Sequence, residues 1–585
     1  MSPYRKSRAR GIQPRPQQDV PAVGPTGQAS AGPSQKQMRR GRLLPRAAGF
    51  VSRAGVQETL AGLRFLLDIP GFLRHPITEG EARTILRQRI AHRESAFLTL
   101  ARRAIYPYAD QPYRRLLDMV GCEFGDLEEL VRRNGLEGAL GALYRKGVYL
   151  TIEEYKGRRA VVRGSATFQM APAQLQNPLV GGRLFVHTSG STGTETPVPL
   201  DVASERDRAI GQCLALAARN GLGWTHAVWE VPGSSGLGEL LAYAALGTPP
   251  ARWFSQVDPA TQGLHPRYAW SGRFLRWGSR VAGVPLPLPE HCSVDDPLPV
   301  AHWMREVLQG GRIPHLHTFA SAGAKLAAAA MAAGVDIAGG QLTLAGEPTT
   351  PARLATIAQS GARAVPKYGA SEIPMIAQGC LAPMASDDLH ICHDLHAVIQ
   401  PGSAAAVGPL PPNALLLSSL QLSTKFVLLN WSPGDQGIVE ERACGCPVEA
   451  MGRHTHLYSV RSFEKLTAGG MTFLDVDIIR VLEEILPARF GGGPIDYQLA
   501  EKEGPTGDPR LLLIVSPAVG PLDEEAVIDA FLEAIGPGVG AERVMGLMWR
   551  SARFVRVERR LPIVSGSGKI LHLVRAPTHP PEGDG

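Results

Sequence analysis

The stretch that decides the fold is Leu184-Phe185-Val186-His187-Thr188-Ser189-Gly190-Ser191-Thr192-Gly193, an apolar run that ends in a loop of hydroxyls and glycines. A strand followed by such a loop commonly holds phosphate, because glycine lets backbone N–H groups approach an anion and hydroxyls add donors. The loop lacks the lysine of the GxxxxGK[ST] motif. On this stretch alone, a phosphate loop and a plain surface loop remain equally open.

The bulk composition narrows the class of protein. A chain of 585 residues is too long for one compact core, so we expect two or three domains. Its 44% hydrophobic and 20% charged residues are typical of soluble globular proteins. We find neither a run of about 18 apolar residues nor a secretory signal, so we expect no membrane partner and a cytoplasmic location. The seven cysteines are therefore not expected to form a disulfide framework.

The net charge of +7 is concentrated at one end of the chain. Residues 1–46 hold ten Lys or Arg and one Asp, a net of +9, which leaves −2 for the remainder. A nearly neutral body argues against a specific nucleic-acid partner. The tail could contact RNA, DNA or anionic lipid through charge alone, but a disordered leader or a start codon placed too early is the simpler interpretation. We predict residues 1–45 to be a disordered basic tail.

The spacing of apolar residues changes twice along the rest of the chain. Residues up to about 180 show apolar residues at helical spacing. After that, short apolar runs alternate with helical stretches, which predicts an α/β fold. The expected strands are Leu184–Val186, Ala227–Val231, Gln341–Leu344 and Leu415–Leu420, and the expected helices are Ala322–Ala333 and Pro351–Ser360. Beyond about 460 we expect a smaller unit with helix Val476–Leu486, strand Leu511–Val515, helix Glu524–Ile535 and a final strand pair ending near Leu573.

Three further motifs change the odds for the opening loop: Lys367-Tyr368-Gly369-Ala370-Ser371-Glu372, Trp431-Ser432-Pro433-Gly434-Asp435-Gln436-Gly437 and Leu561-Pro562-Ile563-Val564-Ser565-Gly566-Ser567-Gly568-Lys569. Each alone is explained at least as well without a ligand: by a turn beside a helix start, by a Pro-Gly-Asp turn, and by an exposed lysine beside glycines. In this order the four motifs resemble the adenylate-forming superfamily over about residues 180–575. The phenylacetate–CoA ligase branch is the most similar, through Ala345-Gly346-Glu347-Pro348-Thr349, Gly379-Cys380, Asp388-Leu389-His390 and Cys444-Gly445-Cys446.

The resemblance implies a domain layout. It implies a large AMP-binding domain over residues 46–460, with sheets sandwiched between helices and a helical lead-in over 46–180. It also implies a small, mobile α+β lid domain over residues 461–585. The two would rotate between half-reactions about a hinge near Arg461.

The resemblance also implies a reaction: a carboxylic acid and ATP give an acyl-adenylate and pyrophosphate, and a thiol such as that of coenzyme A then displaces AMP. This is an AMP-forming acid–thiol ligase. Two alternatives stay open: transfer to an amine or a carrier protein, and a non-catalytic nucleotide-binding homologue. The sequence leaves open the identity of the acid, the acceptor and the oligomeric state, a dimer included.

Site residues follow from the resemblance, position by position. Lys569 and Glu372 would be catalytic, with Lys569 neutralising charge at the α-phosphate and Glu372 holding Mg²⁺. Tyr368 would stack on adenine and Asp435 would bind the ribose. The remaining nucleotide-binding residues would be Thr188, Ser189, Gly190, Ser191, Thr192, Gly193, Gly346, Glu347, Gly369, Ser371 and Arg461. Trp224, Trp229, Phe254, Phe319 and Ile373 are candidates for the acyl pocket, or for ordinary core.

The sequence departs from the family's pattern at two places. Many relatives carry a lysine just after the phosphate loop, where this chain has Thr194-Glu195-Thr196. The hinge reads Arg461-Ser462-Phe463-Glu464, with Phe463 in place of an acidic residue and Glu464 where Asp is usual. An acidic residue close to a triphosphate is unfavourable, so whether these changes reduce activity stays open.

A second group of residues has the composition of a metal site. Cys380, His390, Cys444 and Cys446 could form one tetrahedral zinc centre, whose four protein ligands would make it structural. Similar positions hold a structural zinc in some members of the phenylacetate–CoA ligase branch. Unrelated buried thiols are the alternative, since a Cys-x-Cys pattern alone is weak. Cys392, His393 and His396 lie nearby in the sequence without belonging to this set.

Overall fold

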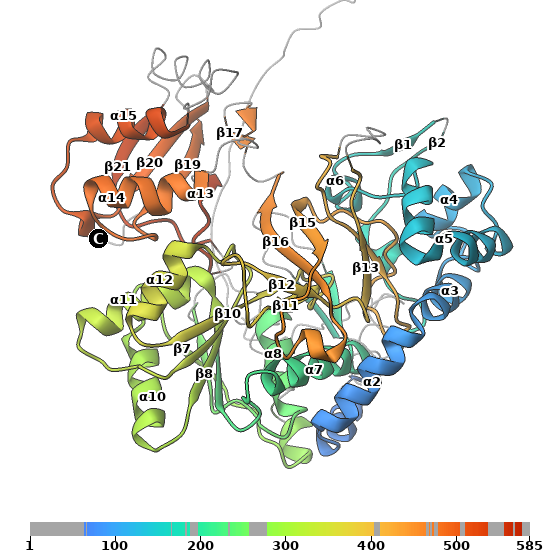
Figure 1. Cartoon of the computed structure of the whole chain (residues 1–585), viewed down its shortest axis with the longest axis horizontal. Helices are drawn as coiled ribbons and strands as arrows, with labels where there is room; N and C mark the ends of the chain where they lie inside the picture. The colour runs from blue at the N-terminus through green and yellow to red at the C-terminus, as the bar shows by residue number, and fades with distance from the viewer. Residues whose placement is uncertain are drawn as a thin grey trace, which may run out of the picture. The chain divides into compact units, whose positions relative to one another are not determined.

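A mixed ten-stranded sheet organises the chain, in the order β15-β16-β12-β11-β10-β9-β8-β5-β6-β7 (Figure 1). The computed structural model describes residues 64–575 except 66, 165, 182–183, 188–196, 232–233, 257–275, 277, 403–409, 464–466, 469–470, 473–477, 504–508, 536–554 and 566–567. The predicted tail over residues 1–45 therefore lies outside the described residues. Residues Arg53–Gly585 form one compact unit.

The parallel half of this sheet has the alternation of strand and helix that the sequence predicts. Strands β10, β9, β8, β5, β6 and β7 pair in parallel. In chain order the elements are β5 (Thr225–Glu230), α8 (Ser234–Ala244), β6 (Arg252–Ser255), β7 (Pro289–His291), α10 (Leu298–Gln309), β8 (Pro314–Phe319), α11 (Ala320–Ala332), β9 (Gln341–Ala345), α12 (Pro351–Gln359) and β10 (Arg363–Tyr368).

Successive residues of β5 show how both faces of the parallel half are covered. Ala227 and Trp229 pack into the core formed with α10, α11 and α12. Val228 points to the opposite face and packs with α8 and with α7 (Val202–Ala217). Side chains alternate between the faces of a strand, so a strand buried on both faces reads as a continuous apolar run.

The other half of the sheet is antiparallel. Strand β10 pairs in parallel with β9 on one side and antiparallel with β11 on the other. The remaining strands here are β11 (Ala377–Gly379), β12 (Leu389–Ile391), β16 (Thr455–Ser462) and β15 (Asp435–Glu441). Two antiparallel pairs lie outside this sheet: β3 (Leu184–His187) with β4 (Pro197–Leu200), and β13 (His396–Ile399) with β14 (Leu416–Ser419).

The lead-in is helical, and it shares a core with the β13–β14 pair. Helices α3, α4 and α5 pack together, with α2 preceding them (Figure 1). The bounds are α2 (Glu79–Ala91), α3 (Arg93–Ala104), α4 (Pro112–Met119), α5 (Phe124–Arg145) and α6 (Ile152–Tyr155), followed by the short pair β1 (Val161–Arg163) and β2 (Ala166–Phe168).

The C-terminal region forms a four-stranded sheet of its own, in the order β21-β20-β19-β22. Its strands are β19 (Tyr497–Glu503), β20 (Pro509–Val515), β21 (Val555–Arg559) and β22 (Leu573–Arg575). The helical segments α13 (Ile478–Arg480), a π-helical turn (Val481–Ile485), α14 (Leu486–Phe490) and α15 (Glu524–Ile535) share one core with this sheet. A short hairpin, β17 (Thr467–Ala468) with β18 (Met471–Thr472), precedes them.

Most expected elements are confirmed within one or two residues, including the helix Glu524–Ile535. The helix expected over Val476–Leu486 differs, because its described part continues to Phe490 and includes a π-helical turn. The final strand pair differs too, because β21 and β22 are not partners. Strand β21 pairs with β20, whereas β22 pairs with β19 at the opposite edge. Sequence periodicity identifies strands but not their neighbours, which explains the error.

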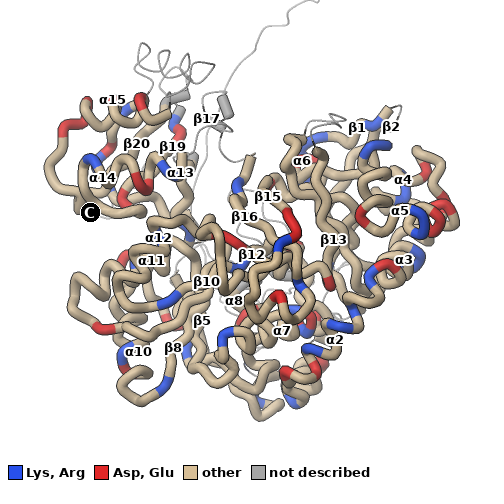
Figure 2. Tube along the Cα trace, viewed as in Figure 1, with Lys and Arg blue, Asp and Glu red and all other residues tan. Residues whose placement is uncertain are grey.

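Charged positions of both signs are interspersed along the described trace (Figure 2). This agrees with the nearly neutral body expected from the sequence. In the part of the chain that the structure describes, no helix is long and apolar enough to cross a membrane.

Asn430 joins the helical lead-in to the β14 region and is a test of that interface. Its side-chain amide donates to the carbonyl oxygens of Leu140 (2.9 Å) and Val148 (3.1 Å), and its φ of 50° is left-handed. Asn430→Ala removes the donor to both carbonyl oxygens and leaves a left-handed backbone without asparagine, so we expect the free energy of unfolding to fall by about 3 kcal/mol. Urea unfolding measures it.

Asn220→Ala is the matched control for this variant. Asn220 has a similar φ of 56° but is exposed, so only the backbone preference changes and the loss should be about 1 kcal/mol. Equal shifts of the urea midpoint in the two variants would contradict the interpretation.

Candidate active site and metal centre

The predicted nucleotide residues of the parallel half gather at one edge of the sheet. Gly346 and Glu347 directly follow β9, and Tyr368 ends β10. Phe319 ends β8, which lies next to β9. The carboxyl ends of parallel strands meet at the same edge, which is where α/β sheets bind their ligands. The sheet topology therefore brings together residues that the sequence separates by about 50 positions.

Tyr368 and Asp435 are in direct contact at this edge. The Tyr368 hydroxyl donates to Asp435 Oδ2 at 2.7 Å. Burial raises the pKa of Tyr368 well above its usual value, and the Asp435 carboxylate raises it further, so the phenol keeps its proton. Asp435 uses one carboxylate oxygen for this bond. The two residues expected to hold adenine and ribose thus lie side by side.

The turn after Tyr368 places Ser371 and Glu372 differently. Backbone bonds between Ala370 and Ile373 close the turn. At Gly369, a Cβ would lie 2.4 Å from the Pro374 carbonyl oxygen, so the turn requires glycine there. Ser371 is exposed, whereas Glu372 is buried. The negative charge of Glu372 helps to raise the pKa of Tyr155, after the larger effect of burial.

Lys569 reaches the same edge from the C-terminal region. Its ammonium lies 5.1 Å from the centre of the Phe319 ring. A Cβ added to Gly346 would lie 3.0 Å from Lys569 Cε, from Lys569 Nζ and from Phe319 Cδ1. Gly346 also has a φ of +74°, which L side chains rarely adopt. The glycine after β9 is therefore what leaves room for the lysine.

Glu347 and Arg461 have protein partners that the sequence did not indicate. The Glu347 carboxylate accepts from the Ser321 backbone N–H (2.7 Å) and from Arg353 (3.1 Å). Arg461 donates to Asp387 Oδ2 at 3.1 Å, and Asp387 also accepts two backbone N–H groups of β16. No motif marks Ser321, Arg353 or Asp387, because only the fold brings them to these sites.

Part of the predicted site lies outside the described residues: the loop Thr188–Gly193, the altered Thr194-Glu195 and the hinge residue Glu464. Phe463 is described, and its backbone N–H donates to the Gly434 carbonyl oxygen at 3.0 Å. This bond ties the start of the predicted hinge to the Pro433-Gly434-Asp435 turn.

The aromatic candidates for the acyl pocket lie mostly in the core. Trp229, Phe254 and Phe319 belong to the cluster beneath α10 and α11, and Trp224 packs against the cluster around α7. Only Ile373 among the five also lines the small cavity next to Glu372, which encloses about 40 Å³. Arg208 and Lys425 line the same cavity.

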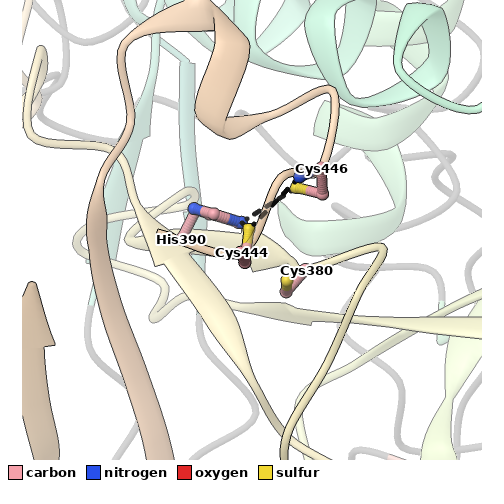
Figure 3. A group of neighbouring side chains, drawn as sticks. All are labelled: Cys380, His390, Cys444 and Cys446. Atoms are coloured by element: carbon pink, nitrogen blue, oxygen red, sulfur yellow. Dashed lines mark hydrogen bonds between the residues drawn. The ribbon is translucent and has the colours of Figure 1, made fainter. Parts of the chain in front are cut away.

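The predicted zinc ligands come together (Figure 3). One ligand atom from each of Cys380, His390, Cys444 and Cys446 lies within 4.8 Å of the others. His390 Nε2 is 3.2 Å from Cys446 Sγ and 3.6 Å from Cys444 Sγ. Zn–S and Zn–N bonds of about 2.3 and 2.0–2.1 Å in a tetrahedron would separate S and N by about 3.6 Å. The donor set and its spacing fit a zinc ion.

Surrounding groups orient these ligands toward the centre. His390 Nδ1 lies 2.8 Å from the Arg453 carbonyl oxygen, which only accepts, so Nδ1 carries the proton and Nε2 presents its lone pair. Burial lowers the pKa of His390 to about 4, which keeps it neutral. Backbone N–H groups of Ala382 and Cys446 approach Cys380 Sγ and Cys444 Sγ at 3.4 and 3.5 Å.

A second group, Cys380 with Asp388 and His456, overlaps the first. Asp388 is already paired with Arg442 and accepts from His456 Nδ1 at 2.7 Å. The Arg442 charge disfavours a cation there. All seven cysteines are free of disulfide bonds.

Comparison with known proteins finds solved structures whose fold is similar to that of this chain. No family model matches the chain, and no curated protein matches it. A solved structure of 2-hydroxyisobutyryl-CoA ligase, in the postadenylation state with R3-HIB-AMP, is similar at 14% identity over 86% of this chain and 91% of that chain, with a TM-score of 0.49. The anthranilate CoA ligase AuaEII with anthranoyl-AMP is similar at 13% identity over 66% of each chain, with a TM-score of 0.40. A Brucella canis acyl-CoA synthetase is similar at 15% identity over 66% of this chain and 62% of that chain, with a TM-score of 0.34.

These similar structures are adenylate-forming CoA ligases, the superfamily that the motifs resemble. The phenylacetate–CoA ligase branch stays a prediction. At such identities and TM-scores the likeness supports no inference about activity, so the function proposed below rests on the residues of this chain.

The metal centre generates a direct prediction. We expect about one zinc per purified chain, lost in Cys446→Ala because three ligands hold zinc far less tightly than four. Elemental analysis after gel filtration measures the stoichiometry. Cys392→Ala, which removes a buried thiol outside the ligand set, should keep its zinc. Equal zinc content in the two variants, or none in the wild type, would refute the assignment.

Proposed function

We propose that this protein is an ATP-dependent ligase that activates a carboxylic acid. The acid attacks the α-phosphorus of ATP to give an acyl-adenylate and pyrophosphate, and a thiol such as that of coenzyme A then displaces AMP. Transfer to an amine or a carrier protein remains the alternative for the second step. ATP, Mg²⁺ and coenzyme A are the small molecules this proposal requires.

The position of Lys569 carries the proposal. A lysine more than 200 residues from β8 and β9 lies at their carboxyl ends, in the space that Gly346 leaves open. A cation fixed at the ligand-binding edge of a parallel sheet can neutralise charge that builds on phosphate and carboxylate oxygens. This is the role that the resemblance assigns to it.

The other residues support the same chemistry. The half-buried Tyr368 ring offers an aromatic surface for adenine, and its bond to Asp435 fixes one oxygen of the carboxylate that would bind the ribose. Glu372 would hold Mg²⁺, since a hard cation takes carboxylate oxygen and keeps its remaining positions for water and phosphate. When bound, Mg²⁺ neutralises part of the triphosphate charge.

The proposed zinc has no chemical step in this scheme. Its four protein ligands leave no open coordination position. It would tie β11 and β12 to the loop carrying Cys444 and Cys446. Glu449 supports that loop by accepting the backbone N–H groups of Cys444 and Gly445.

Lys569→Ala tests the catalytic proposal. With ATP, Mg²⁺ and a pool of aromatic and fatty acids, we expect pyrophosphate release to fall about 10²–10³-fold, the cost of losing one fixed electrostatic contact to the transition state. A coupled pyrophosphate assay measures it, and resolving the pool identifies the acid.

Lys502→Ala serves as the control, because Lys502 is an exposed lysine on β19. It should release pyrophosphate at the wild-type rate. Release unaffected by Lys569→Ala would contradict the proposal. Bound ATP without release in any protein would instead favour the non-catalytic alternative.

Gly346→Ala tests whether Lys569 needs the space next to Gly346. The new methyl group would lie 3.0 Å from Lys569 Cε and Nζ, so we expect at least a tenfold loss of pyrophosphate release. Gly334→Ala is the matched control: its φ of +64° is similar, and nothing lies within 4 Å of the new Cβ. Both variants should lose about 1 kcal/mol of stability. Equal activity in the two would contradict the steric argument.

A further inference from the structure

Glu347 is the first of a series of buried polar side chains that runs from the carboxyl end of β9 into the C-terminal region. Its carboxylate accepts from the Ser321 backbone N–H at 2.7 Å and from the Ser321 hydroxyl at 3.0 Å. Arg353 NH1 donates to the same carboxylate at 3.1 Å. The Glu347 and Arg353 side chains are each 1% exposed. Glu347 is thus fully committed to protein partners.

Arg353 continues this series into the C-terminal region. Its Nε lies 2.8 Å from Glu483 Oε1, and Glu483 belongs to the π-helical turn Val481–Ile485. Thr350 donates to the other Glu483 oxygen. His572 Nε2 lies 2.6 Å from Glu483 Oε1 and must donate, because a carboxylate only accepts. Burial raises the pKa of Glu483, but Arg353 and the hydrogen bonds from His572 and Thr350 lower it by more.

The segment that carries Lys569 is held by both of its flanks. On one side, Gly568 lies against Gln256, where a Cβ would be 1.9 Å from Gln256 Oε1. On the other side, the Ile570 backbone N–H donates to Ser321 Oγ at 3.4 Å, and His572 joins Glu483. A turn closed by Ser565 and Lys569 completes the arrangement.

These contacts have a common physical consequence. A buried charge is tolerated only while its partners stay in place, and removing one partner leaves a costly uncompensated charge. Undocking the Lys569 segment would take Glu483 and His572 away from Arg353 and Thr350 at once. The docked position is therefore a discrete state and not a continuum of loose contacts.

We propose that Ser321, Arg353 and Glu483 are positioning residues that dock the segment Lys569–His572 at the end of β9 and so place the Lys569 ammonium beside Gly346. The inference deepens the proposed function, because it rests on Lys569 acting in adenylation. It assigns Glu347 the role of a structural anchor for this docking.

The test compares Glu483→Gln with Glu484→Gln in the full-length protein. The first removes the buried charge at nearly constant shape, whereas the second changes an exposed neighbour on the same turn. We expect hydrogen exchange of the peptide spanning Ser565–His572 to speed up about tenfold or more in Glu483→Gln only. Pyrophosphate release with the acid pool should fall about tenfold through kcat, with KM for ATP unchanged.

A second variant guards against loss of the fold. Ser321→Ala keeps every charge and removes only the hydroxyl that meets Ile570 and Glu347, so it should show the same changes to a smaller extent. Unchanged exchange of the Ser565–His572 peptide in both variants would overturn the inference, as would exchange that rises equally across the whole protein. A wild type that releases no pyrophosphate would refute the proposed function, and the exchange data would still decide whether the segment is docked.

Discussion

The end of strand β10 is the constraint on which the rest of the structure depends. Two adjacent residues there point to opposite faces of the sheet. Lys367 pairs with Glu239 of α8 at 2.5 Å, and Tyr368 donates to Asp435 at the start of β15. Strand β10 is also where the sheet changes from parallel to antiparallel. One dipeptide therefore joins the helix layer, the parallel half and the antiparallel half at the candidate active site.

The buried charged side chains next to β10 have a structural role. Burial alone would raise the pKa of Glu239, but His317, Lys367 and Arg208 together lower it to about 2. Arg208 and Lys425 share Glu205 in the same way, and these side chains are almost completely buried. Each charge here has a partner, which is the condition under which ions persist in a protein interior. The network holds α7 and α8 against the sheet from which the site residues project.

The candidate metal centre and the Lys569 segment contact different parts of the same sheet. The four proposed zinc ligands connect β11 and β12 with the loop before β16, in the antiparallel half. The Glu347–Arg353–Glu483–His572 chain connects the parallel half with the C-terminal region. Both rely on buried groups whose partners come from distant segments. The proposed metal centre would make one half rigid, whereas the polar chain would hold the Lys569 segment at the end of β9.

The sequence by itself determined the α/β class, most strands and helices, the four motifs and a Cys/His set that the fold brings together as a candidate metal site. These are properties of local pattern: apolar spacing reports which face of an element is buried, and glycine, cysteine and histidine report special chemistry. Only the tertiary structure decided that Tyr368 meets Asp435, that the Arg453 carbonyl selects the His390 tautomer, and that Arg353 pairs with Glu483. It also showed that β22 and β21 lie at opposite edges of their sheet. Most aromatic residues expected to line the acyl pocket, such as Trp229 and Phe254, lie in the core. The physical reason is that periodicity states that a residue is buried but not what covers it, and a charged residue that looks solvent-facing in sequence can be buried once the fold supplies its partner.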